Sequence, residues 1–445
     1  MTTVAWFGPI EAITPEMIRR LRDGIGLTAL IPDSHMVHHS GYRMPEDLLA
    51  RSPLAMWQEQ PGLGVHRKAV GLRSDASPVF PGIVGPRCDD SLFLKVIEQA
   101  GKLGVEVWAH AGLWGYGGDV FPNLALVDDL GKAIPEEYGC WGVPICPNNP
   151  EVRNWTAECL QYIVTHYDVK EIDVDHGHYP PPASIASLLG CCCSWCQAYA
   201  RALGYDWEAM KAALSALRRR ITGLEAAHFL RAIEFSYSLF DFLGYWGYDA
   251  ALLDWYRFRT RSVTAHMAYL TRAVHDVVGD ACPVDSHLFP PSVAFLAGQD
   301  FAEWEKAVDR LTPGWGPVVG WCEAQINTFI VWAAKLCQTV PDLDEAVALA
   351  AIYRLFGYDA LNMPGSIAAL QAGQFPKGSV WALEIRKAGA LLSGSKPFLP
   401  PYRPVGLSAL EAGEWAEAIK AVKAAGFVTG GDLSDETMKI MRTGV

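Results

Sequence analysis

Strand and helix signals alternate along the whole 445-residue chain, and this alternation constrains the fold more than any other feature. Short apolar runs are followed by longer segments in which apolar residues keep helical spacing. Parallel strands need a crossover connection, which is usually a helix, so this alternation is typical of a parallel sheet. The eight predicted strands are residues 3–8, 27–31, 105–109, 169–174, 282–288, 310–315, 397–405 and 427–431.

Eight strands separated by helices predict an α/β fold of the (β/α)₈ TIM barrel type. Residues 197–250 contain more helix than one barrel layer needs, so we interpret them as a helical insertion between the fourth and fifth strands. The sequence has no internal repeat, low-complexity segment or linker that would divide it. We therefore expect a single barrel domain over residues 1–445, with the insertion inside it.

The composition is that of a globular protein with a large core. Half of the residues are hydrophobic, and the formal net charge of −12 argues against nucleic acid or an anionic membrane as a partner. No stretch approaches about 20 consecutive apolar residues, and the first residues lack a basic region followed by an apolar run. We expect a cytoplasmic protein.

The stretch 169–196, VKEIDVDHGHYPPPASIASLLGCCCSWC, concentrates reactive side chains more than any other. Its strand is predicted to point Glu171, Asp173 and Asp175 to one face. Buried acidic groups without partners cost free energy, so their presence indicates a polar site where this strand ends. The residues that follow directly are His176, His178 and Tyr179.

Further polar and aromatic side chains gather at the predicted strand ends. In a parallel barrel these ends meet at one rim, where the active sites of barrel enzymes lie. The rim histidines, proposed to bind substrate, are His35, His110, His176, His178 and His287. The aromatic residues proposed to stack on a sugar ring, or else to belong to the core, are Trp114, Tyr179 and Trp315. Asp432 either hydrogen-bonds sugar hydroxyls or caps the segment that follows.

Two carboxyl groups at one rim can act as a pair, one as proton donor and one as nucleophile or base, which is the pair that glycoside hydrolysis requires. We predict that Asp175 is the nucleophile or base and that Asp173, two residues deeper, is a structural residue of the barrel. The proton donor is either Glu323, just past the sixth strand, or Asp285 on the fifth. Glu323 could instead be an ordinary first-turn acid of a helix.

Eleven cysteines, an odd number without an export signal, indicate reduced thiols. Four of them form the run Cys191, Cys192, Cys193 and Cys196. A structural zinc ion needs about four ligands, and Cys140 or Cys146 could complete such a set. Reduced thiols at the start of a helix are the alternative.

The rim histidines raise a second metal question. Neutral imidazoles suit sugar hydroxyls or a divalent metal equally well. Asp175 with His176 and His178 is a local cluster that a Zn or Mn site could use. We expect no cofactor, with a divalent metal as the alternative.

Three local patterns resemble a group of bacterial glycoside hydrolases with (β/α)₈ barrels, related to the α-amylase-type and family-A clans. The first is a fourth strand of the type D-G-(I/V)-x-x-D-Y-x-R-Y-P followed by C-x-C-x-x-C, seen here at 172–180 and 191–196. The second, W-x-x-F-R-x-x-S-V-T, is matched by Trp255, Phe258, Arg259, Ser262, Val263 and Thr264. The third, L-F-x-P-S with G-Q-D, is matched by 288–292 and 298–300.

The resemblance implies a barrel glycosidase in which Asp175 holds the position of the strand-four carboxylate. Two residues depart from the group. His178 stands where Arg is usual, and His287 stands where a carboxylate is expected on the fifth strand.

We therefore predict a glycoside hydrolase acting on a small glycoside or oligosaccharide. One alternative is a metal-dependent barrel hydrolase or sugar isomerase that uses the rim histidines. Another is a barrel that binds carbohydrate without catalysis. The inserted helices are rich in aromatic residues, which predicts either core packing or a homo-oligomer interface, and we favour the interface.

Overall fold

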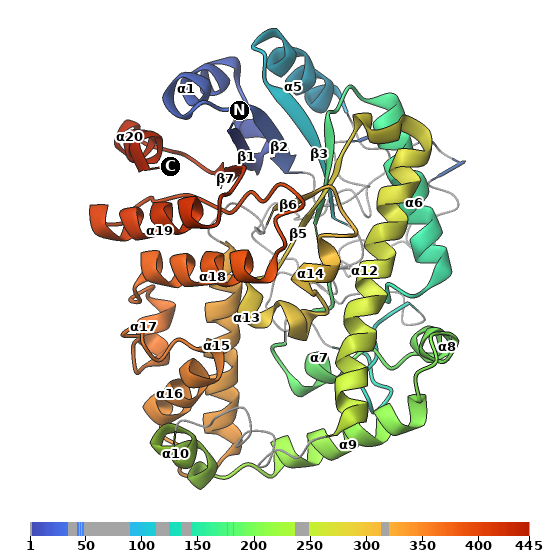
Figure 1. The fold of residues 1–445 in the computed structure, drawn as a ribbon, viewed down its shortest axis with the longest axis vertical. Helices are drawn as coiled ribbons and strands as arrows, with labels where there is room; N and C mark the ends of the chain where they lie inside the picture. Colours follow the sequence, from blue (N-terminus) through green and yellow to red (C-terminus); the bar gives the residue numbers. More distant parts are fainter. Residues whose placement is uncertain are drawn as a thin grey trace, which may run out of the picture.

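The computed structural model describes residues 2–33, 42–43, 45, 47–48, 90–112, 124–134, 145–175, 177–180, 182–235, 249–312 and 320–444, with the backbone only at residues 33, 112 and 320–324. Within these ranges seven parallel strands form one sheet in the order β6-β5-β4-β3-β2-β1-β7. The strands are β1 (Thr3–Pro9), β2 (Ala29–Asp33), β3 (Glu106–Gly112), β4 (Glu171–Asp175), β5 (Val284–His287), β6 (Arg310–Thr312) and β7 (Gly426–Gly430). The sheet curls into a nearly closed barrel, so the predicted fold class is confirmed (Figure 1).

The predicted seventh strand, 397–405, is the one that does not form a regular strand. Its first residues nevertheless lie between β6 and β7, through parallel bridges from Phe398 to Leu311 and from Pro401 to Val428. Leu399 N donates to Leu311 O (2.8 Å), and Val428 N donates to Pro400 O (3.0 Å). Prolines lack the N–H group that a ladder needs, which explains why this segment closes the barrel with isolated bridges.

Helices surround the barrel (Figure 1). Those between the first strands and after β6 are α1 (Pro15–Ile25), α5 (Ser91–Lys102), α6 (Pro150–His166), α15 (Gly320–Thr339), α16 (Glu345–Phe356), α17 (Ile367–Gln371), α18 (Lys377–Leu391), α19 (Ala409–Ala421) and α20 (Asp435–Gly444). Local sequence starts several of them. The Thr14 hydroxyl accepts from Met17 N before α1, and Asn149 accepts from Glu151 N before α6. Ser408 and Glu411 form a capping box at α19.

The connection from β4 to β5 is a long helical excursion. Its helices are α7 (Ile185–Leu189), α8 (Ser194–Ala202), α9 (Trp207–Thr222), α10 (Ala226–Glu234) and α12 (Ala250–Val278). Figure 1 shows α9 and α10 at the end of the molecule opposite β1 and β2. There α10 packs against α16, where Arg354 donates to the carbonyls of Ala232 and Ile233. After β5 come α13 (Pro291–Ala294) and α14 (Phe301–Trp304).

The division into one barrel and an insertion at 197–250 stays an interpretation. Most of the aromatic residues behind the predicted oligomer interface belong to 236–248, outside the described residues. In the part of the chain that the structure describes, no helix is long and apolar enough to cross a membrane.

Helices α18 and α19 pack so closely that one glycine is required between them. A Cβ added at Gly378 would lie 2.4 Å from Glu411 O and 2.6 Å from Glu411 Cβ, whereas one at Gly413 of α19 would meet nothing within 4 Å. We expect Gly378→Ala to lower the free energy of unfolding by about 2 kcal/mol through overpacking. Gly413→Ala should raise it by about 0.5–1 kcal/mol through helix propensity. Urea denaturation of both variants checks this, and equal effects would contradict the close approach.

Candidate active site

Five titratable side chains meet inside the barrel on β3, β4 and β5, and we name them the barrel cluster. They are His110, Asp173, Asp175, Asp285 and His287. Each is at most 5% exposed. A group of this kind is stable without water only if its charges and hydrogen bonds are matched internally.

Strand register arranges the barrel cluster in two layers. His110 pairs with Asp173, and Asp173 pairs with Asp285, so these three lie at one level. Asp175 is the last residue of β4 and lies two residues closer to the carboxyl ends of the strands, level with His287. Because side chains alternate along a strand, residues two apart point to the same side. The predicted one-sided arrangement of the β4 carboxylates is therefore confirmed.

Two imidazoles link the two β4 carboxylates. His110 Nδ1 lies 2.5 Å from Asp173 Oδ2, and His287 Nε2 lies 2.9 Å from Asp173 Oδ1. The other nitrogen of His287, Nδ1, lies 3.3 Å from Asp175 Oδ1, and His110 Nε2 lies 3.8 Å from Asp175 Oδ2. Each histidine thus lies between both carboxylates.

This arrangement fixes the charges of Asp173 and His287. Burial alone would raise the pKa of Asp173, but the charge of His287 and hydrogen bonds from both histidines bring it to about 2. Burial opposes charge on His287 as well, yet the carboxylates of Asp173 and Asp175 outweigh it and raise the pKa of His287 well above its ordinary value. At neutral pH His287 is therefore an imidazolium that forms an ion pair with each of the two carboxylates.

Asp285 has the opposite character. Burial and the charge of Asp173 raise the pKa of Asp285 to about 7. Its Oδ1 accepts from Thr312 N (3.0 Å) and from Thr312 Oγ1 (2.7 Å). Two carboxyl groups at one level of the barrel therefore differ in protonation, Asp173 ionised and Asp285 able to hold a proton. Such a separation of pKa values is typical of acid–base sites.

His178 and Tyr179 are buried just beyond β4. Burial lowers the pKa of His178 to about 4, and its Nδ1 donates to Tyr179 O (2.7 Å), so the imidazole is neutral. Tyr179 is fully buried, and its ring lies 4.6 Å from the Arg259 guanidinium. Its expected role as an exposed stacking surface for sugar is wrong, and core packing, the alternative, is what the structure has.

The remaining predicted residues divide into two groups. The side chain of Asp432 is almost fully exposed and lies 3.6 Å from Arg20 Nη1 on the outside of the barrel. Glu323 lies in the first turn of α15, and its side chain is outside the described residues, as are His35, Trp114, His176 and Trp315. For these residues the sequence-based roles stay predictions.

Sequence reasoning missed a side chain that joins the ends of β4 and β5. Gln299 Nε2 donates to Gly177 O (3.1 Å) and to His287 O (3.0 Å), while its Oε1 accepts from Phe289 N (2.7 Å). The preceding Gly298 has φ +83°, and a Cβ there would lie 2.6 Å from the Tyr179 ring. The G-Q-D pattern was the signal that could have located this brace.

A second missed set lies deeper in the barrel. Arg310 Nη1 donates to Glu171 Oε2 at 2.6 Å and lies over the Trp108 ring at 4.7 Å. Arg310 compensates the lowest of the three carboxylates on β4. The signal was an arginine two residues before Thr312 on the short sixth strand.

Outside the barrel, four thiols converge, and we name them the cysteine tetrad. They are Cys146, Cys191, Cys193 and Cys196, whose sulfur atoms all lie within 4.8 Å of one another. Antiparallel bridges join Ala125 to Ile145 and Val127 to Ala133. Cys192 N donates to Val127 O (2.7 Å), which brings Cys146 to the cysteine run that follows α7.

Metal geometry distinguishes the tetrad from the barrel cluster. Tetrahedral zinc with bonds of about 2.3 Å to sulfur places neighbouring sulfurs about 3.8 Å apart. The Sγ atoms of Cys146 and Cys196 lie 3.5 Å apart, and those of Cys193 and Cys146 lie 3.4 Å apart. Nitrogen and oxygen ligands bound at about 2.0–2.1 Å would be about 3.3 Å apart. The histidine nitrogens at Asp173 are closer than this to its oxygens, at 2.5 Å for His110 and 2.9 Å for His287. The tetrad fits a tetrahedral ion, and the barrel cluster fits hydrogen bonding.

A cavity of about 400 Å³ lies elsewhere, between α13, α16 and α18. Its lining residues are Pro291, Ser292, Leu355, Phe356, Lys387, Ala390 and Leu391. None of them belongs to the barrel cluster, so this cavity is not the substrate site that the strand ends predict.

No protein-family model matches the sequence, and no curated protein matches it. Solved structures with a similar arrangement include the glycoside hydrolase domain of PgaB (BpsB) from Bordetella bronchiseptica, at 11% identity and a TM-score of 0.49 over 97% of this chain and 94% of that one. The catalytic domain of a β-amylase from Paenibacillus polymyxa is similar at 11% identity and a TM-score of 0.46, over 98% of this chain and 94% of that one.

A β-galactosidase from the psychrophilic Marinomonas ef1 is similar at 10% identity and a TM-score of 0.45, over 96% of this chain and 53% of that one. The chain spans about half the length of the β-galactosidases that it matches. Likenesses at these identities concern the barrel fold, and no residue role is carried over from them.

Asp285 and Asp173, which lie at the same level of the barrel, predict opposite effects of pH on the stability of the fold. The folded-state pKa of Asp285, about 7, exceeds its ordinary value of 3.8, so the folded protein keeps a proton that the unfolded chain loses and stability falls as pH rises toward 7. We expect the free energy of unfolding of Asp285→Asn, relative to that of the unmodified protein, to rise by about 2–3 kcal/mol between pH 5 and pH 8. Urea denaturation at both values measures this.

Asp173→Asn is the matched control. The folded-state pKa of Asp173 is about 2, below its ordinary value of 3.8. Ionised Asp173 therefore stabilises the folded protein above about pH 4, and this stabilisation is lost as pH falls toward 2. Asp173→Asn should therefore be destabilised at neutral pH. A difference between Asp285→Asn and the unmodified protein that stays constant from pH 5 to pH 8 would mean that Asp285 is ionised throughout.

Proposed function

We propose that this protein is a glycoside hydrolase that cleaves a small glycoside or oligosaccharide, with Asp175 as nucleophile or base. The observation that carries the proposal is the position of Asp175, the last residue of β4, with the His287 imidazolium 3.3 Å from its Oδ1. Barrel enzymes hold their catalytic groups at the carboxyl ends of the strands. A buried carboxylate there, matched by a cation, can stay ionised without bulk water.

In glycoside hydrolysis positive charge develops on the sugar ring, which would lie next to Asp175. The imidazolium of His287 stabilises a negative charge on Asp175, and Asp173 balances His287 from the layer below. Gln299 supports the pair because it holds the backbone ends of β4 and β5 together. The oxocarbenium-like transition state would then meet a carboxylate whose position is fixed in advance.

The proton donor is either Asp285 or Glu323. A general acid works best when its pKa lies near the working pH, and the pKa of Asp285 is about 7. Glu323 lies in the first turn of α15, which follows β6. Substrate contacts are proposed for the rim residues His35, His110, Trp114, His176, His178, His287 and Trp315.

A metal-dependent hydrolase or isomerase is the second candidate. His110, Asp173 and His287 each offer one donor atom within 4.8 Å of the others, but these atoms would have to move apart at Asp173 to hold an ion. In that case His110→Ala would remove one metal equivalent from the purified protein and chelation would abolish turnover. A barrel that only binds carbohydrate would show calorimetric binding without turnover.

Aryl glycosides of several sugars test the glycosidase proposal. We expect the unmodified protein to hydrolyse at least one of them and Asp175→Asn to lower kcat by about 10³-fold or more, because the group that meets the transition state is lost. Asp435→Asn, an exposed carboxylate on α20, is the control and should keep full activity. Turnover by Asp175→Asn at the rate of this control would refute the assignment.

The same assay separates the two proton donors. Loss of the general acid harms substrates with poor leaving groups more than dinitrophenyl glycosides, whose leaving group needs no proton. Asp285→Asn and Glu323→Gln should therefore differ, and the acid is the residue whose variant shows the larger leaving-group dependence. If neither variant shows such a dependence, the proton donor is another group.

A further inference from the structure

Arg259 on α12 is a fully buried cation. Its Nη1 donates to Leu296 O (2.7 Å) and to Leu188 O (3.4 Å), and its Nη2 donates to Ser187 O (3.3 Å). Within the described part of the chain, Nε has no hydrogen-bond partner and no carboxylate lies within ion-pair distance of the guanidinium. Removing a charge from water costs several kcal/mol unless an opposite charge is near.

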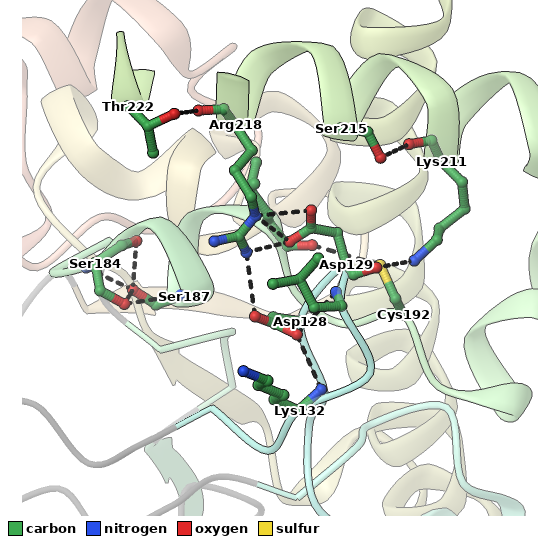
Figure 2. Close-up of polar contacts among 12 residues, drawn as sticks. Asp128, Asp129, Lys132, Ser184, Ser187, Cys192, Lys211, Ser215, Arg218 and Thr222 are labelled. Atoms are coloured by element: carbon green, nitrogen blue, oxygen red, sulfur yellow. Dashed lines mark hydrogen bonds and ion pairs between the residues drawn. The ribbon is translucent and has the colours of Figure 1, made fainter. Parts of the chain in front are cut away.

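Two partly buried arginines, Arg218 and Arg310, have acidic partners. Figure 2 shows Arg218 of α9 between Asp128 and Asp129, with Nη2 donating to both. Arg310 is matched by Glu171. Among these three arginines, only Arg259 has no carboxylate partner in the described part of the chain. An anion of another kind near Arg259 would balance its charge.

The cysteine tetrad lies beside Arg259. Arg259 binds the carbonyls of Ser187 and Leu188 on α7, and Cys191 follows Leu188 by three residues. The ring of the buried Tyr179 also lies against the guanidinium, at 4.6 Å.

A second contact from α12 reaches the tetrad one helical turn later. Ser262 Oγ accepts from Asn148 Nδ2 (3.1 Å), and the same Nδ2 lies 3.3 Å from Cys196 Sγ. Residues three apart share a helix face, so Arg259 and Ser262 both lie on the side of α12 that faces the tetrad.

The tetrad sulfurs also accept backbone N–H groups. Asn148 N donates to Cys146 Sγ (3.4 Å), and Cys196 N donates to Cys193 Sγ (3.4 Å). A thiolate is a better acceptor than a thiol, and metal binding requires the thiolate form. Four thiolates around a divalent ion leave a net charge of about −2 in a buried place.

We propose that Arg259 is the counter-cation of a divalent metal centre, of the zinc class, held by the thiolates of the cysteine tetrad. Metal binding releases the thiol protons to solvent, and the guanidinium then balances half of the remaining negative charge. The three carbonyl bonds hold Arg259 in place through its planar fork. Arg259 is a positioning residue that touches neither the metal nor a substrate.

The test compares zinc binding by the full-length protein and by Arg259→Gln and Arg259→Lys. Zinc content comes from elemental analysis, and affinity comes from competition with a chromophoric chelator. We expect about one zinc per chain at the tetrad and an affinity about 10- to 100-fold weaker in Arg259→Gln, as for other partners of metal ligands. Arg259→Lys keeps the charge and loses the fork, so its affinity should stay within a few-fold of the unmodified protein.

Arg218→Gln is the control, because it removes a partly buried arginine whose charge is balanced by aspartates. It should lower the melting temperature and leave zinc affinity unchanged. Cobalt substitution adds a spectroscopic check, since four thiolates give an intense charge-transfer absorption that Cys193→Ser should weaken. If Arg259→Gln does not fold, Arg259→Lys decides: a tenfold loss of affinity overturns the proposal, and so does a tetrad that takes up no zinc.

Discussion

The barrel interior holds negative charge away from water because two imidazoles lie between the carboxylates of β4. His287 forms ion pairs with Asp173 and Asp175 at once, and His110 hydrogen-bonds to Asp173. Without the His287 cation and the second imidazole, the carboxylates of Asp173 and Asp175 could not be buried together. The charge of Asp173 in turn raises the pKa of Asp285, so the protonation of Asp285 depends on this match.

Compensation of buried charge recurs in three forms around this barrel. Glu171 is matched by Arg310. Arg218, in the connection between β4 and β5, is matched by Asp128 and Asp129 from the segment between β3 and α6 (Figure 2). The third form is proposed for Arg259 and the cysteine tetrad. In each case a single long side chain crosses between elements that are distant in sequence, so the charges also fix how those elements pack.

A protonated Asp285 beside an ionised Asp173 costs stability, because like charges and burial both disfavour its ionised form. Active sites commonly retain such costs where the chemistry needs a proton. His178 and His287, the two departures from the resembling group, also differ in protonation. His178 is neutral, bonded to its own neighbour's carbonyl, while His287 supplies the positive charge of the cluster.

The sequence by itself determined the barrel, because strand and helix periodicities are local, and seven strands form within a few residues of the predicted positions. It also placed Asp175 at the end of β4, since alternation along a strand is fixed by geometry. Only the tertiary structure decided which groups meet: Asp285 with Thr312, Cys146 with Cys191 and Cys196, and Tyr179 with Arg259 rather than with solvent. Those contacts join residues far apart in the chain, and burial and charge balance select them only after the elements pack.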